Sequence, residues 1–499
     1  MSGTRYGHQF RDTGLGIVKR KASAPGFGLR VLIGLVIVLN EIVFVNVLGS
    51  AGVELVLSSA IVTIALLIQL RFAVRQDAGA PADIVLFIFS WLFLDLAPKV
   101  QLLSMPQRLV NTSTVDVGTV ATTNLVCALF MVTFTIVYAI LSRHAEVAAA
   151  PAAAAPQQEF SARGVGIAAL ICVLVVGAAA PLVYHSVGNE EAATPAKLVM
   201  SRFILFLPSA TFLILLNETI RSRRKLLFSR VCVLLLMFIL VAITENPYTE
   251  KRNALGPVYL GLVLVLFQNW FSSRNRRMFL LVSGMVLVFP AIAVFTQNHN
   301  AILGQFSADQ LWDQIADHYF SINYDSWANV YTSVEIVRVH GLQWGHQLLG
   351  SLLFFVPSSL WTSKPLATGI FLGNYLTAHY DMWFTNLSAP LVGEGYLDFG
   401  YAGVVAYAAV MAYLVTYLNS LARRQDKWAA LPMAIYASVF LMIVLRGSLM
   451  IAMGFAVAAF LAFGLASAML SLKLGVRQTR RAGREIARRP TGVSLRHGG

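Results

Sequence analysis

Long apolar runs separated by short polar stretches dominate the sequence. Twelve of these runs approach the roughly 20 residues that a helix needs to cross the hydrocarbon core of a bilayer. They fall at 29–48, 53–70, 83–101, 118–141, 164–184, 198–216, 226–243, 254–271, 278–295, 391–418, 429–446 and 448–471. This pattern predicts an all-α, polytopic integral membrane protein with about twelve transmembrane helices.

Basic residues between the runs predict the orientation of the chain. Arginine and lysine lie ahead of the first run and again in the loops after the second, sixth and eighth runs. Because cytoplasmic loops carry the excess of positive charge, these positions place both termini in the cytoplasm. The basic tails 1–28 and 472–499 and the Ala/Pro-rich linker 145–162 are then all cytoplasmic.

Composition supports a membrane protein and argues against a nucleic-acid partner. Hydrophobic residues make up 57% of the chain and charged residues 12%, about half the charged fraction of a soluble domain. The net charge of +14 follows the tails and alternate loops, as membrane topology requires, so we expect the lipid bilayer as a partner and no nucleic acid. The three cysteines all lie in apolar runs and predict helix packing.

The runs divide the chain into a nine-helix membrane region at 29–295, a large external loop at 296–390 and a three-helix membrane region at 391–471. One apolar run inside the loop, 346–361, is short and contains Pro357. If it crossed the membrane, Arg423, Arg424 and Lys427 would fall outside, against the charge rule. We therefore interpret it as a re-entrant or interfacial segment.

Aromatic residues are frequent in the external loop and lie among scattered polar residues. Aromatic faces next to hydroxyl-binding groups suit a sugar ring, although an interfacial aromatic belt gives the same composition. The candidates for glycan contact are Tyr324, Asp325, Trp361 and, just after the loop, Tyr396.

Two carboxylates mark the start of the tenth predicted span. Glu394 and Asp398 are four residues apart, so a helix would place them on one face, with Gly400 and Gly403 leaving room for another helix. An ionisable residue at membrane depth costs about 3 kcal/mol or more unless it faces protein or water, which makes these two residues a functional-site hypothesis. Two solvated acids at the interface are the alternative.

Four basic residues lie on the predicted external side, where the charge rule does not favour them: Arg252, Arg338, Lys364 and Arg446. An anionic ligand explains such positions, and an extended lipid diphosphate suits them because guanidinium groups bind phosphate oxygens in a bidentate manner. For Arg252 the alternative is pairing with a neighbouring glutamate, and for Arg446 it is snorkelling to the interface.

Three further charged residues lie inside predicted spans. Asp95 and Lys99 are four residues apart and can pair with each other, and Glu41 can lie in the interior of the bundle. A transporter would use such residues. No motif for nucleotide binding, serine hydrolysis or zinc catalysis is present, and we expect no cofactor and no metal.

The ordered motifs of the last third resemble one family. They are Phe354-x-x-Pro357-x-x-x-Trp361-x-x-Lys364-Pro365, Gly393-Glu394-x-Tyr396-x-Asp398-Phe399-Gly400-x-x-Gly403 and Arg446-Gly447-Ser448. Together with twelve spans and a large loop between the ninth and tenth, they resemble the bacterial oligosaccharide repeat-unit polymerases, which include O-antigen and exopolysaccharide polymerases related to O-antigen ligases. The ligase branch typically has a histidine where Glu394 stands.

The resemblance implies a membrane glycosyltransferase similar to those of the C type. Its substrate would be undecaprenyl-diphosphate-linked oligosaccharide, polymerised at the external face of the bacterial inner membrane, with a flippase and a chain-length regulator as partners. Glu394 would be the general base, assisted by Asp398, and Arg252, Arg338, Lys364 and Arg446 would hold the diphosphate. An O-antigen-type ligase and a flippase or transporter for lipid-linked oligosaccharide are the alternatives.

Overall fold

The computed structural model describes residues 27–48, 52–72, 74, 80–103, 109–112, 114–148, 160–179, 195–222, 228–247, 252–288, 319–424 and 427–472. All regular secondary structure within these ranges is helical. The basic tails, most of the Ala/Pro linker and the first part of the predicted external loop lie outside the described residues.

The first half of the chain supplies two groups of helices. The first group consists of α1 (Phe27–Leu48), α2 (Val53–Phe72), α3 (Ala82–Trp91), the π-helical η1 (Leu92–Leu96), α4 (Ala97–Leu102) and α5 (Val117–Ala148). The second consists of α6 (Ala162–Ala178), α8 (Pro195–Arg221), α9 (Phe228–Thr244), α10 (Arg252–Leu266), η3 (Trp270–Ser272), α11 (Arg274–Ser283) and the π-helical η4 (Gly284–Val288). The chain runs from α3 through η1 into α4, and from α11 into η4, without leaving the helical state.

The second half contains the described part of the external loop and three long helices. The loop forms η5 (Ile322–Tyr324), α14 (Ser326–His340), α15 (His346–Leu352) and α16 (Thr368–Tyr380). It is followed by α17 (Leu391–Arg423), α18 (Ala430–Arg446) and α19 (Leu449–Leu470). The apolar run 346–361 is thus one short helix followed by turns, and it forms no helix long enough to cross a bilayer.

The described parts of the twelve apolar runs expected from the sequence are helical almost throughout, which confirms the all-α prediction for the described residues. Among the described residues, six helices are long and apolar enough to cross a membrane: α1, α2, α5, α8, α17 and α19. Shorter apolar helices occur in α6, α9, α10 and α18. Large apolar side chains on α1, among them Leu35 and Leu39, are about 60% exposed, as on a lipid-facing surface. These features support the assignment to the membrane.

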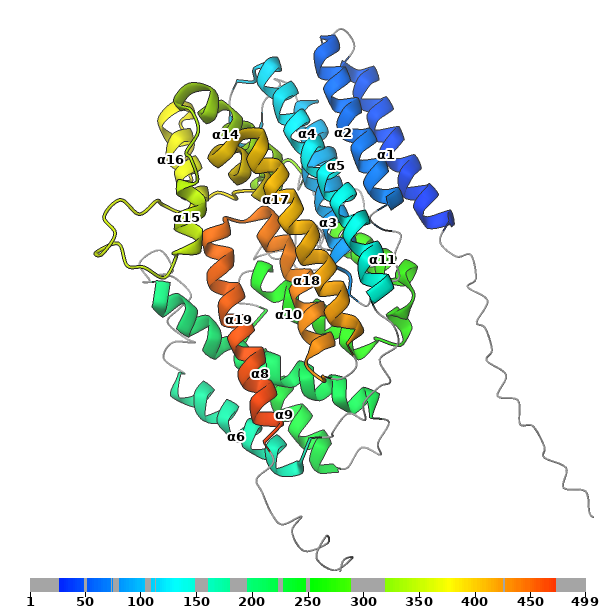
Figure 1. Cartoon of the computed structure of the whole chain (residues 1–499), viewed down its shortest axis with the longest axis vertical. Helices are drawn as coiled ribbons and strands as arrows, with labels where there is room; N and C mark the ends of the chain where they lie inside the picture. The colour runs from blue at the N-terminus through cyan, green and yellow to red at the C-terminus, as the bar shows by residue number, and fades with distance from the viewer. Residues whose placement is uncertain are drawn as a thin grey trace, which may run out of the picture.

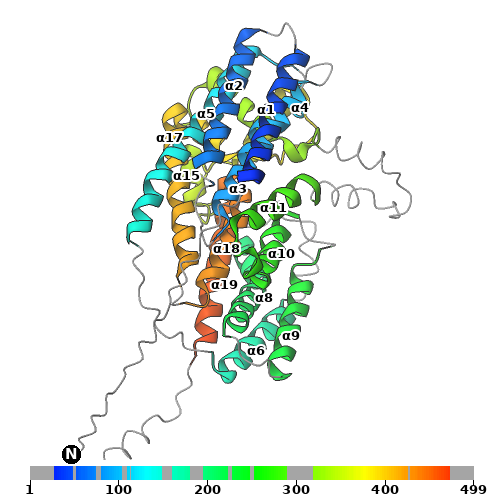
Figure 2. The same ribbon diagram turned by 90° about the vertical axis from the view of Figure 1, so that its right-hand side faces the viewer.

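Two hydrophobic cores underlie the arrangement of the helices. The first is built from α1 to α5 together with α14, α17 and parts of α11 and α18, and the second from α6, α8, α9 and α10 together with α18 and α19. Figure 1 shows α1, α2 and α5 side by side at one end of the molecule and α6, α8 and α9 at the other. Figure 2 separates the same two groups in a perpendicular view. The long helices α17, α18 and α19 connect them, because α17 packs on α5, α18 on α17 and α10, and α19 on α8.

Candidate functional site

The site begins with a sharp bend in α17. Phe399 (φ −137°, ψ 15°) and Gly400 (φ 62°, ψ −144°) leave the helical conformation, and Gly400 adopts a positive φ that a side chain would oppose. The two arms of α17 fold so closely together that a Cβ on Gly403 would lie 1.9 Å from the carbonyl oxygen of Gly395. Gly403 therefore makes room for the preceding arm of its own helix, whereas the sequence suggested a separate helix at this position.

Glu394 lies on the short first arm of α17 and is buried. Its Oε1 accepts a hydrogen bond from the backbone N–H of Leu449 at 3.0 Å, the first residue of α19. The neighbouring Ser448 Oγ accepts from the backbone N–H of Thr368, the first residue of α16, at 3.2 Å. One carboxylate is thus placed where the external loop meets the turn between α18 and α19.

Asp398 lies one helical turn after Glu394 and binds a different helix. Its two oxygens accept hydrogen bonds from the backbone N–H groups of Gln347 (3.1 Å) and Leu348 (2.8 Å), which are unpaired donors at the start of α15. The two acids do share one helical face, as the sequence predicted, and both are buried. Asp398 therefore holds α15 against α17, a positioning role that spacing alone did not reveal.

Arg446 ends α18 and forms an ion pair with a buried acid of the external loop. One terminal nitrogen donates to Asp325 Oδ1 and to the carbonyl oxygen of Ile322, both at 3.3 Å, and the guanidinium lies 5.8 Å from the ring centroid of Phe93. Its side chain keeps 30% exposure, while that of Asp325 keeps 2%. Arg446 Nε is buried without a hydrogen-bond partner among the described residues. The guanidinium is therefore held by Asp325 and remains partly exposed to solvent.

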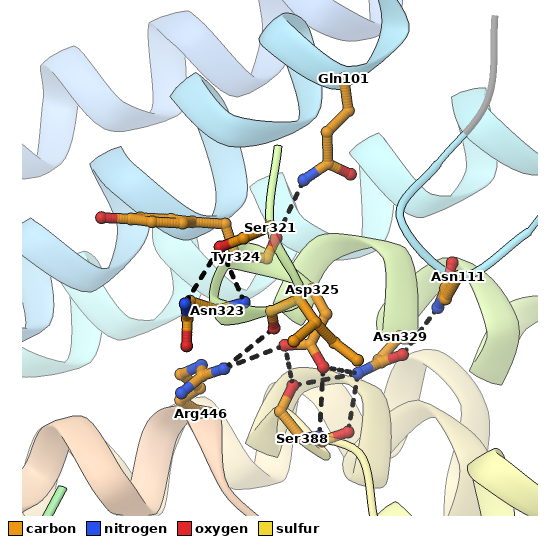
Figure 3. A network of polar contacts seen from close by, with 10 residues as sticks. Gln101, Asn111, Ser321, Asn323, Tyr324, Asp325, Asn329, Ser388 and Arg446 are labelled. Carbon is orange, nitrogen blue, oxygen red and sulfur yellow. Dashed lines mark hydrogen bonds and ion pairs between the residues drawn. The ribbon is translucent and has the colours of Figure 1, made fainter. Parts of the chain in front are cut away.

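A polar network fixes Asp325 in front of Arg446 (Figure 3). Ser388 Oγ donates to Asp325 Oδ1 at 2.6 Å, and Asn329 Nδ2 donates to Oδ2 at 2.9 Å. The backbone N–H of Ser388 also donates to Oδ2 at 3.3 Å, and Asn111 donates to Asn329 Oδ1 at 2.7 Å. Asp325 is therefore a buried counter-ion with several donors of its own, which leaves little of it accessible to a sugar.

Arg338 lies at the other end of α14, exposed to solvent. Its guanidinium donates to Asp116 Oδ2 at 2.8 Å and to Thr119 Oγ1 at 3.1 Å. Hydrogen bonds from Thr119 and from Arg338 hold the pKa of Asp116 below its ordinary value. Thirteen residues of helix separate Arg338 from Asp325, or ~20 Å at 1.5 Å per residue. The structure therefore does not bring Arg338 together with Arg446.

Lys364 is held by the loop between α15 and α16. Its Nζ donates to the carbonyl oxygens of Phe354 (2.7 Å) and Val356 (2.8 Å), and burial lowers its pKa. The lysine thereby closes the loop on itself. Arg252 is the first residue of α10, and its side chain lies outside the described part of the chain.

The four candidates for glycan contact differ in accessibility. Tyr324 is buried and stacks on Phe93 with a centroid separation of 5.1 Å, and Tyr396 is buried with Tyr401 edge-on at 5.4 Å. Trp361 is partly exposed, and its indole N–H donates to Ser363 Oγ at 3.0 Å. Together with the buried Asp325, this leaves Trp361 as the candidate best placed to contact a ligand.

Sequence reasoning missed a second acidic centre in the external loop. Glu335 of α14 accepts hydrogen bonds from the hydroxyls of Tyr375 (3.1 Å) and Tyr380 (2.6 Å), both of α16. Desolvation by burial, together with the nearby Glu335 carboxylate, raises the pKa of Tyr375 to about 12. No local spacing predicts this cluster, since Glu335 and Tyr375 are 40 residues apart. In the network around Asp325, the contact with Asn329 could have been predicted from the i,i+4 spacing of the two residues. The contact of Asp325 with Ser388 could not.

The described residues contain no group of three or more His, Cys, Asp or Glu side chains able to hold a metal ion. Chemically, the site offers a buried carboxylate that accepts from the first residue of α19, and a partly exposed guanidinium on the last residue of α18. No family model, curated protein or solved structure matches this chain.

Proposed function

We propose that the protein is a membrane glycosyltransferase that polymerises polyprenyl-diphosphate-linked oligosaccharide repeat units at the external face of a bacterial inner membrane. The proposal includes twelve membrane spans with both termini in the cytoplasm and a fold similar to that of C-type glycosyltransferases. The observation that carries it is the position of Glu394. Its buried carboxylate lies where the external loop, the first arm of α17 and the start of α19 meet, and the start of α19 follows closely in sequence after the cation at the end of α18.

In this proposal Glu394 acts as the general base. It takes the proton from the acceptor hydroxyl while the hydroxyl oxygen forms a bond to the anomeric carbon of the donor. The bond between that carbon and the diphosphate oxygen breaks, and the diphosphate leaves with the electron pair. Attack from the face opposite the leaving group inverts the anomeric configuration.

Three of the basic residues take three different roles under the same proposal. Arg446 binds the leaving diphosphate, because its guanidinium is fixed by Asp325 yet remains partly exposed. Lys364 stabilises the loop that carries Trp361. The next residue of this loop, Pro365, packs against Gly350 of α15. Arg338, ~20 Å away along α14, contacts a more distant part of the glycan rather than the diphosphate.

The test is the length distribution of lipid-linked glycan in cells that lack the gene and are complemented with variants. Glu394→Gln keeps a side-chain oxygen that can accept from Leu449, but it removes the base, so we expect chain growth to fall about 10²–10⁴-fold at unchanged protein level. The matched control is Glu54→Gln, an exposed acid in the first turn of α2. Long glycan in Glu394→Gln cells would refute the assignment of the base.

A second candidate function is transport of lipid-linked oligosaccharide across the membrane. It is favoured by the buried charges of Glu41, Asp95 and Lys99 within the first group of helices. The same cells separate the two functions. Single repeat units that accumulate outside the inner membrane indicate a missing polymerase, whereas units retained on the cytoplasmic side indicate a missing flippase.

A further inference from the structure

A second buried group of charges lies between α1, α2, η1 and α4. Lys99 Nζ is 2.8 Å from Glu41 Oε2 and 2.5 Å from Asp95 Oδ1. Two hydroxyls of α2 complete the group, because Ser59 and Thr63 each donate to Glu41 Oε2 at 2.9 Å. We call Glu41, Asp95 and Lys99 the charge triad.

The charges of the triad do not balance. Two carboxylates face one ammonium, which leaves one net negative charge if all three groups are ionised. Among the described residues, Lys99 and Glu41 are the charged groups that act on Asp95, and α2 adds only uncharged hydroxyls. An unbalanced buried charge is so costly that the group normally changes its protonation state instead.

Two carboxyl oxygens of the triad lack a hydrogen-bond partner within the described residues. They are Glu41 Oε1 and Asp95 Oδ2, both buried. The Asp95 side chain has 0% exposure and that of Lys99 has 5%. An ionised carboxylate with a bare buried oxygen loses its hydration without compensation, whereas a neutral carboxyl group loses far less. A metal cation is disfavoured here because the ammonium of Lys99 already lies between the two acids and would repel it.

The backbone around Asp95 sets it apart from an ordinary helix. Residues Leu92–Leu96 form a π-helical turn inside an otherwise continuous α-helix. Such turns are rare overall, and those that occur are often found at functional sites. Glu41 keeps 13% side-chain exposure and is the least enclosed of the three side chains, whereas Asp95 keeps none.

From this geometry we propose that the charge triad is a reversible proton-binding site. It holds one proton on its two carboxyl groups at neutral pH, with Lys99 neutralising the other, and releases and rebinds that proton as the pH changes. The proposal is independent of polymerase activity and would equally serve transport.

The experiment is infrared spectroscopy of the full-length protein in vesicles of phosphatidylethanolamine and phosphatidylglycerol, with the proton itself as the probe. Spectra of the wild type are compared at neutral pH with those of Asp95→Asn and Glu41→Gln. Each variant leaves one acid and one base, which need no extra proton. Both variants should therefore lose the absorption of about one protonated carboxyl group. Lys99→Met, which leaves two acids and no base, should gain one.

Controls make the result decisive even if Lys99→Met fails to fold. Glu54→Gln removes an exposed acid and should leave the protonated-carboxyl absorption unchanged. Absorption equal to wild type in both Asp95→Asn and Glu41→Gln would overturn the proposal, since both acids would then be ionised. Loss in only one variant would also overturn it, because the proton would then belong to a single buried acid. The wild-type absorption should fall as the pH is raised and return when the pH is restored, and a change that does not reverse would contradict exchange.

Discussion

Two buried ion-pair networks in this protein enclose their cations to different degrees. In the charge triad, Lys99 is enclosed with two acids, and none of the three side chains exceeds 13% exposure. In the second network, Asp325 is just as deeply buried, but its partner Arg446 remains 30% exposed. One network is closed around its cation and the other leaves its cation partly available.

This difference separates a site for a proton from a site for a larger ligand. An enclosed ammonium between two carboxylates can exchange only something as small as a proton. A guanidinium that is anchored by a buried acid, with its Nε unpartnered in the described part of the chain, can still bind an anion from outside. The geometry around each cation therefore decides what each network can bind.

The largest expected effect comes from removing the cation of the closed network. Lys99→Met leaves two buried acids without their base, and we expect the free energy of unfolding to fall by about 3–5 kcal/mol. Thermal unfolding of the purified protein in detergent, followed by circular dichroism, measures the change, with the exposed Lys427→Met as control. The loss should shrink as the pH is lowered, because the folded variant holds two protons on these acids where the wild type holds one, and binding the extra proton costs less at lower pH. A loss as small as that of the control would show that the triad contributes nothing to stability.

Breaking the open network should cost less. Asp325→Asn removes the counter-ion of Arg446 and weakens the acceptor of Ser388, and we expect a loss of about 2–3 kcal/mol. Arg446 can recover part of its hydration because it is partly exposed, which Lys99 cannot. A double-mutant cycle with Arg446→Met isolates the pair. Additive losses in the double variant would indicate that the two residues do not interact.

The bend in α17 folds the arm that carries Glu394 against the arm that follows it. Gly403→Ala would place a Cβ 1.9 Å from the Gly395 carbonyl oxygen, so the two arms of α17 must separate. We expect a loss of about 1–3 kcal/mol and a fall in glycan length. The matched control is Gly261→Ala in α10, where no atom lies within 4 Å of the added methyl group. Equal behaviour of the two variants would show that the close approach in α17 is not required.

Local patterns predicted the helices but not the contacts between them. The described parts of the twelve apolar runs appear as helices, because hydrophobicity over about 20 residues is a local property of the sequence. The pairing of Asp95 with Lys99 also followed from i,i+4 spacing. That Glu41 joins them from α1 depends on how α1 and α2 pack, which no spacing encodes.

The candidate site shows the same limit. Glu394 and Asp398 were expected on one helical face, and they are, but the sequence could not show that each caps a different helix. Those contacts join residues that are about 50 positions apart in the chain. Arg338 and Arg446 were grouped because both are cations on the predicted external side, yet α14 holds them ~20 Å apart. Residue type and predicted side of the membrane do not determine distance.

A third ion pair should contribute the least to stability. Asp116 and Arg338 are both exposed, so water and salt screen their attraction, and Asp116→Asn should change the unfolding midpoint only slightly. Because the folded pKa of Asp116 is lowered, its contribution is present above the ordinary aspartate pKa of about 3.9 and is lost as the pH falls through the lower folded value. Unfolding midpoints of wild type and Asp116→Asn should therefore differ slightly at neutral pH and converge in that acidic range. A difference at neutral pH as large as that of Asp325→Asn would mean that exposure does not govern the strength of these pairs.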